Sequence, residues 1–178
     1  MERPIPYEGD KNYIFISYAH KDSARVWPVI ERMQKDGFRI RFLGDISALP
    51  EELRDLCLET VEVGNQVDAK YQINVCLNYG GRDEIVRAAR EFARKVAAGE
   101  CAPDALTEEN FSDLMFSAGV PDPELVIRPS GELRLSNFLL WQCAYSEFYF
   151  TDVLWPDFGK DELHKAIADF QKRDRRYG

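Results

Sequence analysis

The sequence predicts an α/β fold with a mainly parallel β-sheet flanked by helices. Short apolar runs of strand length alternate with longer stretches in which apolar residues recur at helical spacing. The 178 residues are 45% hydrophobic and 30% charged, which suits one ordinary globular domain able to bury its own core. We therefore expect residues 1–178 to form a single α/β domain.

The expected strands are short runs of aromatic and β-branched residues. Residues 13–18 (YIFISY) form a continuous apolar run that ends at a polar cluster, which is typical of a buried parallel strand. Residues 38–43 (FRIRFL) alternate in polarity, and the helical stretch between the two runs makes this start a βαβ unit. Further β-rich segments are expected at Tyr71–Leu77, Leu125–Ile127 and Phe148–Leu154.

Helical segments are expected between these strands. Residues 21–35 show helical spacing up to a stop at Gly37, and Asp83–Ala98 is a clear amphipathic helix that ends at Gly99. Thr107 opens a helix as its N-cap, with Asn110 at the position of the capping box. The remaining helices are expected at Pro50–Val63, from the N-cap Ser136 to about Tyr145, and at Lys160–Arg173.

The composition excludes several classes of function. A net charge of −8 argues against a nucleic-acid partner, because phosphate backbones are bound by clustered Lys and Arg. No apolar run approaches the ~20 residues that span a bilayer, so we expect at most peripheral membrane contact. The four cysteines include no CxxC pair, which is typical of reduced thiols in a cytoplasmic protein.

The loop Arg128–Ser136 (RPSGELRLS) carries groups that suit a diphosphate. Ligands of parallel sheets gather beyond the C-terminal ends of the strands, and this loop leaves an expected strand there. It supplies the guanidinium groups of Arg128 and Arg134, the hydroxyl of Ser136 and the N-terminus of an expected helix. A solvated loop with ordinary surface arginines has the same composition, so the residues alone leave both interpretations open.

Two further features have a structural and a functional interpretation. The glycines of Asn78–Arg82 (NYGGR) would let the backbone approach a phosphate closely, although a plain Gly-Gly turn is favoured. Glu147 lies in apolar surroundings, where a carboxylate is either paired structurally or a ligand of Mg²⁺, which prefers oxygen. The residues alone favour the pairing.

The stretch Val126–Phe158 (VIRPSGELRLSNFLLWQCAYSEFYFTDVLWPDF) resembles the signature region of undecaprenyl diphosphate synthases, which are cis-prenyltransferases. The resemblance continues back through NYGGRDEIVRAAREFARKV to about Arg39 and forward to Gly178. It implies a parallel sheet around a hydrophobic tunnel, a homodimer, and an isoprenyl transferase. Such an enzyme condenses isopentenyl diphosphate with an allylic diphosphate, for example farnesyl diphosphate, to give polyprenyl diphosphates.

The resemblance also assigns roles to particular residues. Glu147 would help to hold Mg²⁺, and Arg176 and Gly178 would belong to a tail that reaches the partner subunit's site. Pro129 departs from the family pattern, in which Thr is common there. The residues that would bind or lie near the substrate diphosphates are Arg128, Arg134, Ser136, Asn78 and Arg82.

The N-terminal part departs further from the family, because no DGNGRW-like loop with its metal-binding Asp is present. No catalytic residue is therefore identified, and we expect impaired activity. Residues 12–40 instead resemble the start of a bacterial Toll/interleukin-receptor (TIR) domain, with FISYAHKD as the match. We thus expect a TIR-like start at 1–40 followed by a cis-prenyltransferase C-terminal body at 41–178. The N-terminal part of the family fold would be truncated or replaced by this start. The alternatives are a non-catalytic prenyltransferase subunit or binding module, and a TIR-type signalling or NAD-cleaving protein.

Overall fold

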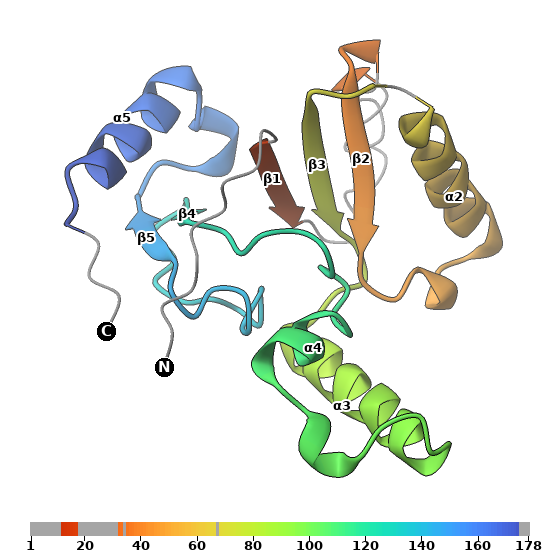
Figure 1. The fold of residues 1–178 in the computed structure, drawn as a ribbon. Helices are drawn as coiled ribbons and strands as arrows, with labels where there is room; N and C mark the ends of the chain where they lie inside the picture. Colours follow the sequence, from red (N-terminus) through yellow and green to blue (C-terminus); the bar gives the residue numbers. More distant parts are fainter. Residues whose placement is uncertain (1–11, 18–31, 34, 67, 175–178) are drawn as a thin grey trace. The chain divides into compact units, whose positions relative to one another are not determined.

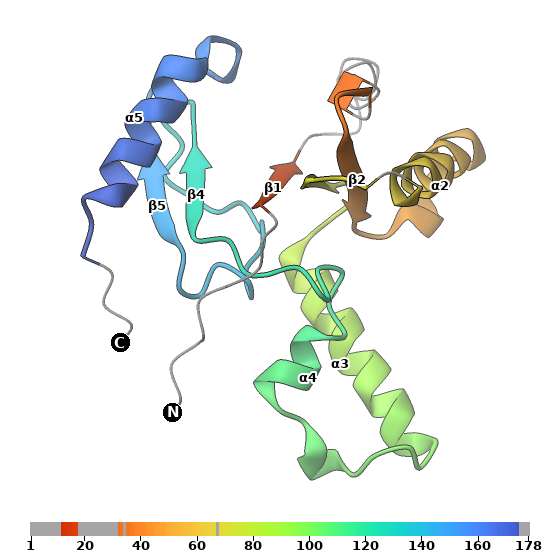
Figure 2. The same ribbon diagram turned by 45° about the horizontal axis from the view of Figure 1, so that its top comes forward.

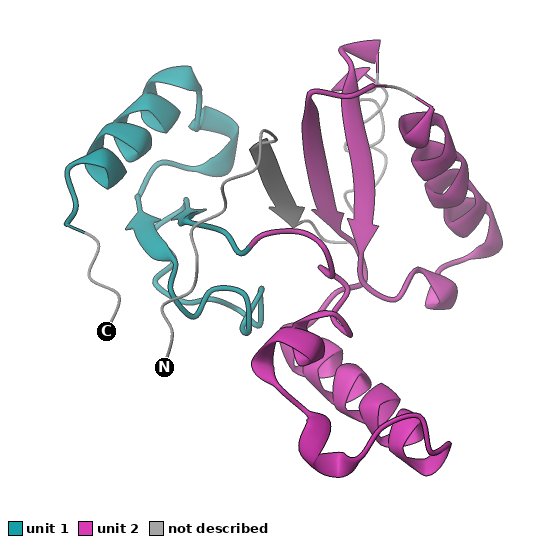
Figure 3. Ribbon diagram, in the orientation of Figure 1, with its two compact units in different colours: residues 1–6, 122–178 teal, residues 7–121 magenta. Residues whose placement is uncertain are grey.

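The computed structural model of the chain describes residues 12–17, 32–33, 35–66 and 68–174. Contacts divide the chain into two compact units (Figure 3). The larger unit comprises residues 7–121, and the smaller unit comprises residues 122–178 with residues 1–6. The expectation of a single domain stays a prediction.

A three-stranded parallel sheet organises the larger unit (Figure 1). Its strands are β1 (Asn12–Ser17), β2 (Phe38–Leu43) and β3 (Tyr71–Cys76), in the order β1-β3-β2. Tyr71 is level with both Asn12 and Phe38, so the strands start together and also end together. The C-terminal loops of β2 and β3 are therefore neighbours, and the loop after β3 is the NYGGR loop.

The core of this unit lies on the central strand. Ile73 and Val75 of β3 pack with Ile40 of β2, and all three side chains are at most 1% exposed. Met33, Phe38 and Phe42 pack around them. Burial of such side chains is the main favourable contribution to folding, and the strand residues predicted from the sequence supply it.

Among the described residues of the larger unit, three helices accompany the sheet. Helix α2 (Glu51–Asn65) packs against β2, and α3 (Gly81–Ala97) packs against the short α4 (Glu108–Ser112). Thr107 caps α4 through the predicted capping box with Asn110. Two 3₁₀ turns, η2 (Ile46–Ala48) and η3 (Pro103–Ala105), lie in the connections. Of the predicted helix 21–35, only residues 32–33 and 35 are described, and these are helical; the rest lies outside the described residues.

The smaller unit is built on two parallel strands, β4 (Leu125–Arg128) and β5 (Glu147–Phe150). Leu125 is level with Glu147, and Arg128 is level with Phe150. A 3₁₀ turn, η4 (Trp155–Asp157), leads to helix α5 (Lys160–Gln171), which packs against β5 (Figure 2). Arg128 thus marks the C-terminal edge of this sheet, and Glu147 marks its N-terminal edge.

The helix predicted from Ser136 to Tyr145 is wrong, because this stretch is a series of turns. Ser136, Asn137 and Leu139 have φ angles of 49°, 64° and 44°, which a right-handed helix cannot contain. Ser and Asn tolerate this region better than most residues, and the turns bury Leu139 and Gln142 to 1% and 2% exposure. Burial of these side chains therefore overrides the helical pattern, and no helix N-terminus forms at Ser136.

All strand pairs that the structure describes are parallel, and helices pack against the strands, which confirms the predicted α/β fold class. Among the described residues, no helix is long and apolar enough to cross a membrane.

Candidate functional site

The first candidate site is the loop that follows β4 in the smaller unit. Nη2 of Arg128 lies 3.3 Å from the hydroxyl oxygen of Ser136 and donates a hydrogen bond to it. The structure thus brings together two of the residues that the sequence assigned to a diphosphate. Nε of Arg128 is buried and makes no hydrogen bond, so the guanidinium keeps an unused donor at this place.

The backbone of the loop is held by the segment after β5. The N–H groups of Ser130 and Gly131 donate to the carbonyl oxygens of Val153 and Thr151, at 2.8 and 2.9 Å. Gly131 has a φ of +68°, and a Cβ there would lie 3.1 Å from the carboxylate of Asp152. These two N–H groups are therefore used within the fold and are not available as donors to a ligand.

Arg134, the other predicted phosphate ligand of this loop, forms an ion pair with Glu132. Nη2 of Arg134 lies 2.6 Å from the Glu132 carboxylate, and the arginine side chain is 69% exposed. An exposed pair of this kind contributes little to stability. The pair is therefore open to exchange with an anion of higher charge.

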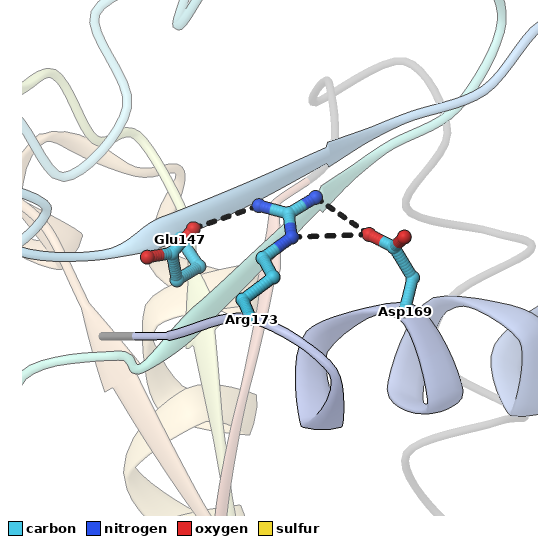
Figure 4. Close-up of polar contacts among 3 residues, drawn as sticks. All are labelled: Glu147, Asp169 and Arg173. Carbon is cyan, nitrogen blue, oxygen red and sulfur yellow. Dashed lines mark hydrogen bonds and ion pairs between the residues drawn. The ribbon is translucent and has the colours of Figure 1, made fainter.

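Glu147 is paired, as the sequence favoured. Its Oε2 accepts a hydrogen bond of 2.7 Å from Nη1 of Arg173 (Figure 4). Arg173 also donates from Nε and Nη2 to the Asp169 carboxylate, at 3.1 and 2.6 Å. The hydrogen bond from Arg173 to Glu147 is the largest cause that raises the pKa of the guanidinium, and the hydrogen bond to Asp169 is the next largest.

The structure does not bring Glu147 to the diphosphate loop. Glu147 begins β5, whereas Arg128 is level with Phe150, three residues further along that strand. Three residues of strand correspond to about 10 Å. The two predicted site residues thus lie at opposite ends of the strands, Arg128 at the C-terminal end and Glu147 at the N-terminal end.

The chemistry of Glu147 suits Mg²⁺, but its surroundings do not form a magnesium site. Mg²⁺ takes six oxygen ligands in octahedral geometry, several of them waters or substrate phosphates. Within the described ranges, no three His, Cys, Asp or Glu side chains are grouped to hold a metal. Arg173 meanwhile bonds the one candidate carboxylate, so the residues as arranged do not fit the ion.

The second candidate site is the NYGGR loop, which follows β3 in the larger unit. Nδ2 of Asn78 donates to the carbonyl oxygen of Asp45 at 2.9 Å, and the Asp45 N–H donates to the Asn78 carbonyl oxygen at 3.3 Å. Gly44 permits this approach, because a Cβ there would lie 2.1 Å from the Leu77 carbonyl oxygen. Asn78 therefore fastens the end of β3 to the end of β2, and Arg82 is exposed in the first turn of α3.

Sequence reasoning missed a buried carboxyl beside this loop. Glu84 is 1% exposed, and its two oxygens accept hydrogen bonds from the Tyr79 hydroxyl at 2.5 Å and the Phe116 N–H at 2.7 Å. Its position in the first turn of an amphipathic helix is typical of a surface residue, so no sequence pattern indicated that it would be buried. Glu84 joins the NYGGR loop to the loop after α4.

Two arginines hold that second loop from other elements. Arg41 of β2 donates to the carbonyl oxygens of Phe116 and Ala118, each at 2.8 Å. Arg87 of α3 donates to the Leu114 carbonyl oxygen at 2.7 Å, and its guanidinium lies 4.2 Å from the centre of the Phe116 ring. Residues 114–118 are therefore fixed by three charged or polar side chains. The remaining predicted site residues, Arg176 and Gly178, lie outside the described residues.

Comparison with known proteins assigns a family to this arrangement. The prenyltransferase family model, described as undecaprenyl diphosphate synthase, matches residues 15–178. An isoprenyl transferase from Prochlorococcus marinus is 48% identical over 149 residues, which cover 84% of this chain and 54% of that protein. The chain spans little more than half the length of the curated relatives it matches.

Solved structures give the same assignment. Lavandulyl diphosphate synthase from Lavandula x intermedia, in complex with dimethylallyl diphosphate, is similar with a TM-score of 0.80 and 32% identity. The match covers 94% of this chain and 78% of that one. A probable undecaprenyl diphosphate synthase from Campylobacter jejuni is similar with a TM-score of 0.73 and 30% identity, over 94% of this chain and 82% of that one.

Proposed function

Because the chain belongs to the undecaprenyl diphosphate synthase family of prenyltransferases, we propose that it acts in joining isopentenyl diphosphate to an allylic diphosphate. Farnesyl diphosphate is the expected allylic partner, and the product class is a polyprenyl diphosphate. The contact between Arg128 and Ser136 carries this proposal. This contact places the guanidinium group of Arg128, which can donate two parallel hydrogen bonds, beside the hydroxyl group of Ser136. Both lie at or beyond the C-terminal end of a parallel strand, where ligands of such sheets bind.

The diphosphate of isopentenyl diphosphate would bind to side chains of the loop after β4. Arg128 offers its buried Nε as well as Nη2, which Ser136 now accepts from. Arg134 would exchange Glu132 for the ligand, because a diphosphate carries more charge than one carboxylate and accepts two parallel hydrogen bonds. No helix N-terminus contributes at Ser136, so the affinity rests on these three side chains.

The allylic substrate would bind more weakly. Departure of its diphosphate needs positive charge on the leaving oxygens, and the sequence contains no DGNGRW-like loop to provide it. We expect Arg82 and Asn78 to lie near the diphosphate of the allylic substrate. Arg82 would supply positive charge, and Asn78 would hold the NYGGR loop in place through its hydrogen bond to Asp45. We therefore propose little turnover by this chain alone.

Magnesium, a homodimer and a cytoplasmic location belong to the same proposal through the family. Glu147 stays the predicted magnesium ligand, and it would have to exchange Arg173 for the ion. Arg176 and Gly178 stay predicted as a tail that reaches the partner subunit's site. The division into a start at 1–40 and a body at 41–178 also stays a prediction.

Isothermal titration with isopentenyl diphosphate, in the presence of Mg²⁺, tests the binding site. Arg128→Lys keeps the charge but loses the fork, so we expect binding to weaken at least about tenfold, the value of one charge-assisted hydrogen bond. Arg94→Lys, in an exposed pair on α3, is the matched control and should leave the affinity unchanged. Equal affinities of wild type and Arg128→Lys would refute the role of Arg128 in binding isopentenyl diphosphate. Equally tight binding of farnesyl diphosphate would refute the proposal that the allylic substrate binds more weakly.

Two alternatives differ from a prenyltransferase in the activity that they predict. A non-catalytic subunit or binding module would bind isopentenyl diphosphate and raise the turnover of an active homologue with which it co-purifies. A TIR-type protein would cleave NAD. The TIR-like interpretation of residues 12–40 rests on the motif alone, and the prenyltransferase family model already matches from residue 15 onward. Product formation at a rate normal for prenyltransferases would exclude the non-catalytic alternative.

A further inference from the structure

Strand β4 has the sequence of an interior strand but lies at the edge of its sheet (Figure 2). Its first three residues, 125–127, are all apolar, as in strands of parallel sheets that are covered on both faces. Among the described residues, β4 pairs with β5 alone, so no strand lies on its other side. None of the four residues of β4 is buried, whereas the last four residues of the central strand β3 are all buried. The more apolar strand is thus the less covered one.

The outer side of β4 presents backbone groups that β5 does not use. The carbonyl oxygens of Glu124 and Arg128 accept hydrogen bonds of 2.9 and 3.2 Å from N–H groups at the two ends of β5. Successive residues of a strand direct their backbone groups to alternate sides. The N–H and C=O groups of Leu125 and Ile127 therefore point away from β5. Groups arranged in this way are a template for the pairing of another strand.

Two prolines limit the length of this free edge. Pro123 and Pro129 flank β4 and have no N–H to donate. The edge can therefore pair with a segment about as long as residues 124–128. A two-stranded sheet is marginally stable in water, and a third strand on the outer side of β4 would also cover its apolar residues.

We propose that the free edge of β4 binds a parallel strand of a second polypeptide, which is apolar on both faces and is followed by a phosphate-binding loop. Such a strand would lie about 4.8 Å from β4 and would end level with Arg128. Its loop would then lie beside the loop Arg128–Ser136, where ligands of a parallel sheet gather. The inference rests on the proposed function in one respect. The sequence contains no DGNGRW-like loop for the allylic diphosphate, and the loop of the second polypeptide would take that role.

The rest of this chain offers no better occupant for the edge. Strands β1, β2 and β3 form a sheet of their own. Residues 1–11 (MERPIPYEGDK) contain two prolines and five charged residues, a sequence that does not suit an interior strand. The parallel direction is proposed because every strand pair that the structure describes is parallel.

Hydrogen exchange of single amides in the full chain, measured by nuclear magnetic resonance, is the direct test. The probe is the part of the isoprenyl transferase from Prochlorococcus marinus that the sequence match leaves uncovered, produced as a separate polypeptide. In the chain alone, the amides of Leu125 and Ile127 should exchange faster than that of Val126, which points to β5. Adding the probe should slow exchange at Leu125 and Ile127 at least about tenfold, the value of one hydrogen bond. Exchange at Val126 should not change.

A pair of variants at one position separates the backbone donor from the side chain. Leu125→Pro removes the N–H that points to the free edge, and a proline is tolerated where its missing N–H would face solvent. We expect it to weaken binding of the probe, measured by isothermal titration, at least about tenfold. Leu125→Val keeps the N–H and an apolar side chain, and should bind the probe like wild type. Equal affinities of the two variants would contradict strand pairing at this edge.

Three exchange results would overturn the proposal. Slow exchange at Leu125 and Ile127 in the dilute chain alone would mean that another part of this chain fills the edge. Slowing that grows with the concentration of this chain would identify a second copy as the occupant. Exchange that the probe leaves unchanged would mean that the edge does not accept this strand.

Binding of the two diphosphates separates this inference from the proposed function. The complex with the probe should bind farnesyl diphosphate at least about tenfold more tightly than the chain alone, the value of one charge-assisted hydrogen bond. Unchanged affinity would refute the placement of the loop beside Arg128. Failure of the proposed function gives a different result, namely slowed exchange at Leu125 and Ile127 without any binding of isopentenyl diphosphate.

Discussion

Replacing Glu84 by Ala should lower the free energy of unfolding by about 3–5 kcal/mol. The carboxyl is 1% exposed and accepts from the Tyr79 hydroxyl and the Phe116 N–H. The Ala variant leaves both donors without this acceptor, at about 1–3 kcal/mol each, and leaves a small void as well. A loss of this size is a large part of the stability of an ordinary domain.

Glu84→Gln separates the hydrogen bonds from the packing. The amide oxygen can still accept from Phe116, and the amide nitrogen can donate to Tyr79 if that hydroxyl turns round, because a hydroxyl both donates and accepts. We therefore expect a loss of only about 1–2 kcal/mol for Gln. Tyr79→Phe should cost about 1–2 kcal/mol, and its cost should shrink in the Glu84→Ala background because the two residues share one bond.

Urea unfolding followed by circular dichroism measures these differences. The dependence of stability on urea concentration should stay constant among the variants, so that the shift of the midpoint reports stability alone. Glu91→Ala, in an exposed ion pair on the same helix, is the control and should cost less than about 1 kcal/mol. A Glu84→Ala variant within 0.5 kcal/mol of wild type, a margin of about the size of an ordinary surface change, would refute the reasoning.

Three further outcomes follow from single positions. Gly44→Ala should cost about 2–4 kcal/mol in urea unfolding, because its Cβ would lie 2.1 Å from the Leu77 carbonyl oxygen at a φ of +130°. Gly99→Ala, with φ +75° and open space, should cost only about 1 kcal/mol, and equal losses would contradict the steric account. Desolvation of its carboxyl group raises the pKa of Asp122 from 3.8 to about 6, although the residue as a whole is exposed. The folded state therefore binds more protons over that interval, and its stability falls as pH rises through it. Asp122→Asn should remove this fall, with a gain at pH 8 of less than about 1 kcal/mol because the residue is exposed, and none at pH 3. Burial raises the pKa of Cys57 to about 11, so iodoacetamide at pH 8 should label the half-buried Cys101 first, as mass spectrometry would show.

Local patterns were sufficient wherever neighbouring residues determine the structure. The strand at Phe38–Leu43 and the capping box of Thr107 and Asn110 lie where the sequence predicted them. Hydrophobic alternation and a hydroxyl three residues before an amide act within a few residues of chain, so the sequence carries them completely.

The candidate site depended more on contacts that cross the sequence. The motif around Arg128 determined the family and the closeness of Arg128 to Ser136, whereas the expected helix after Ser136 gave way to turns that bury Leu139. Phe116, which donates to Glu84, lies 32 residues away from it, and Arg173 lies 26 residues away from Glu147. No local pattern specifies such pairs, because they form only when folding brings distant elements together.

By itself, then, the sequence determined the α/β class and the family, and it predicted which residues suit a diphosphate. Only the tertiary structure decided which of those residues meet. It placed Arg128 and Glu147 at opposite edges of one strand pair, and it gave Glu147 an arginine as its partner. The physical reason is that strand register and helix packing, rather than residue type, set the distance between two charged side chains.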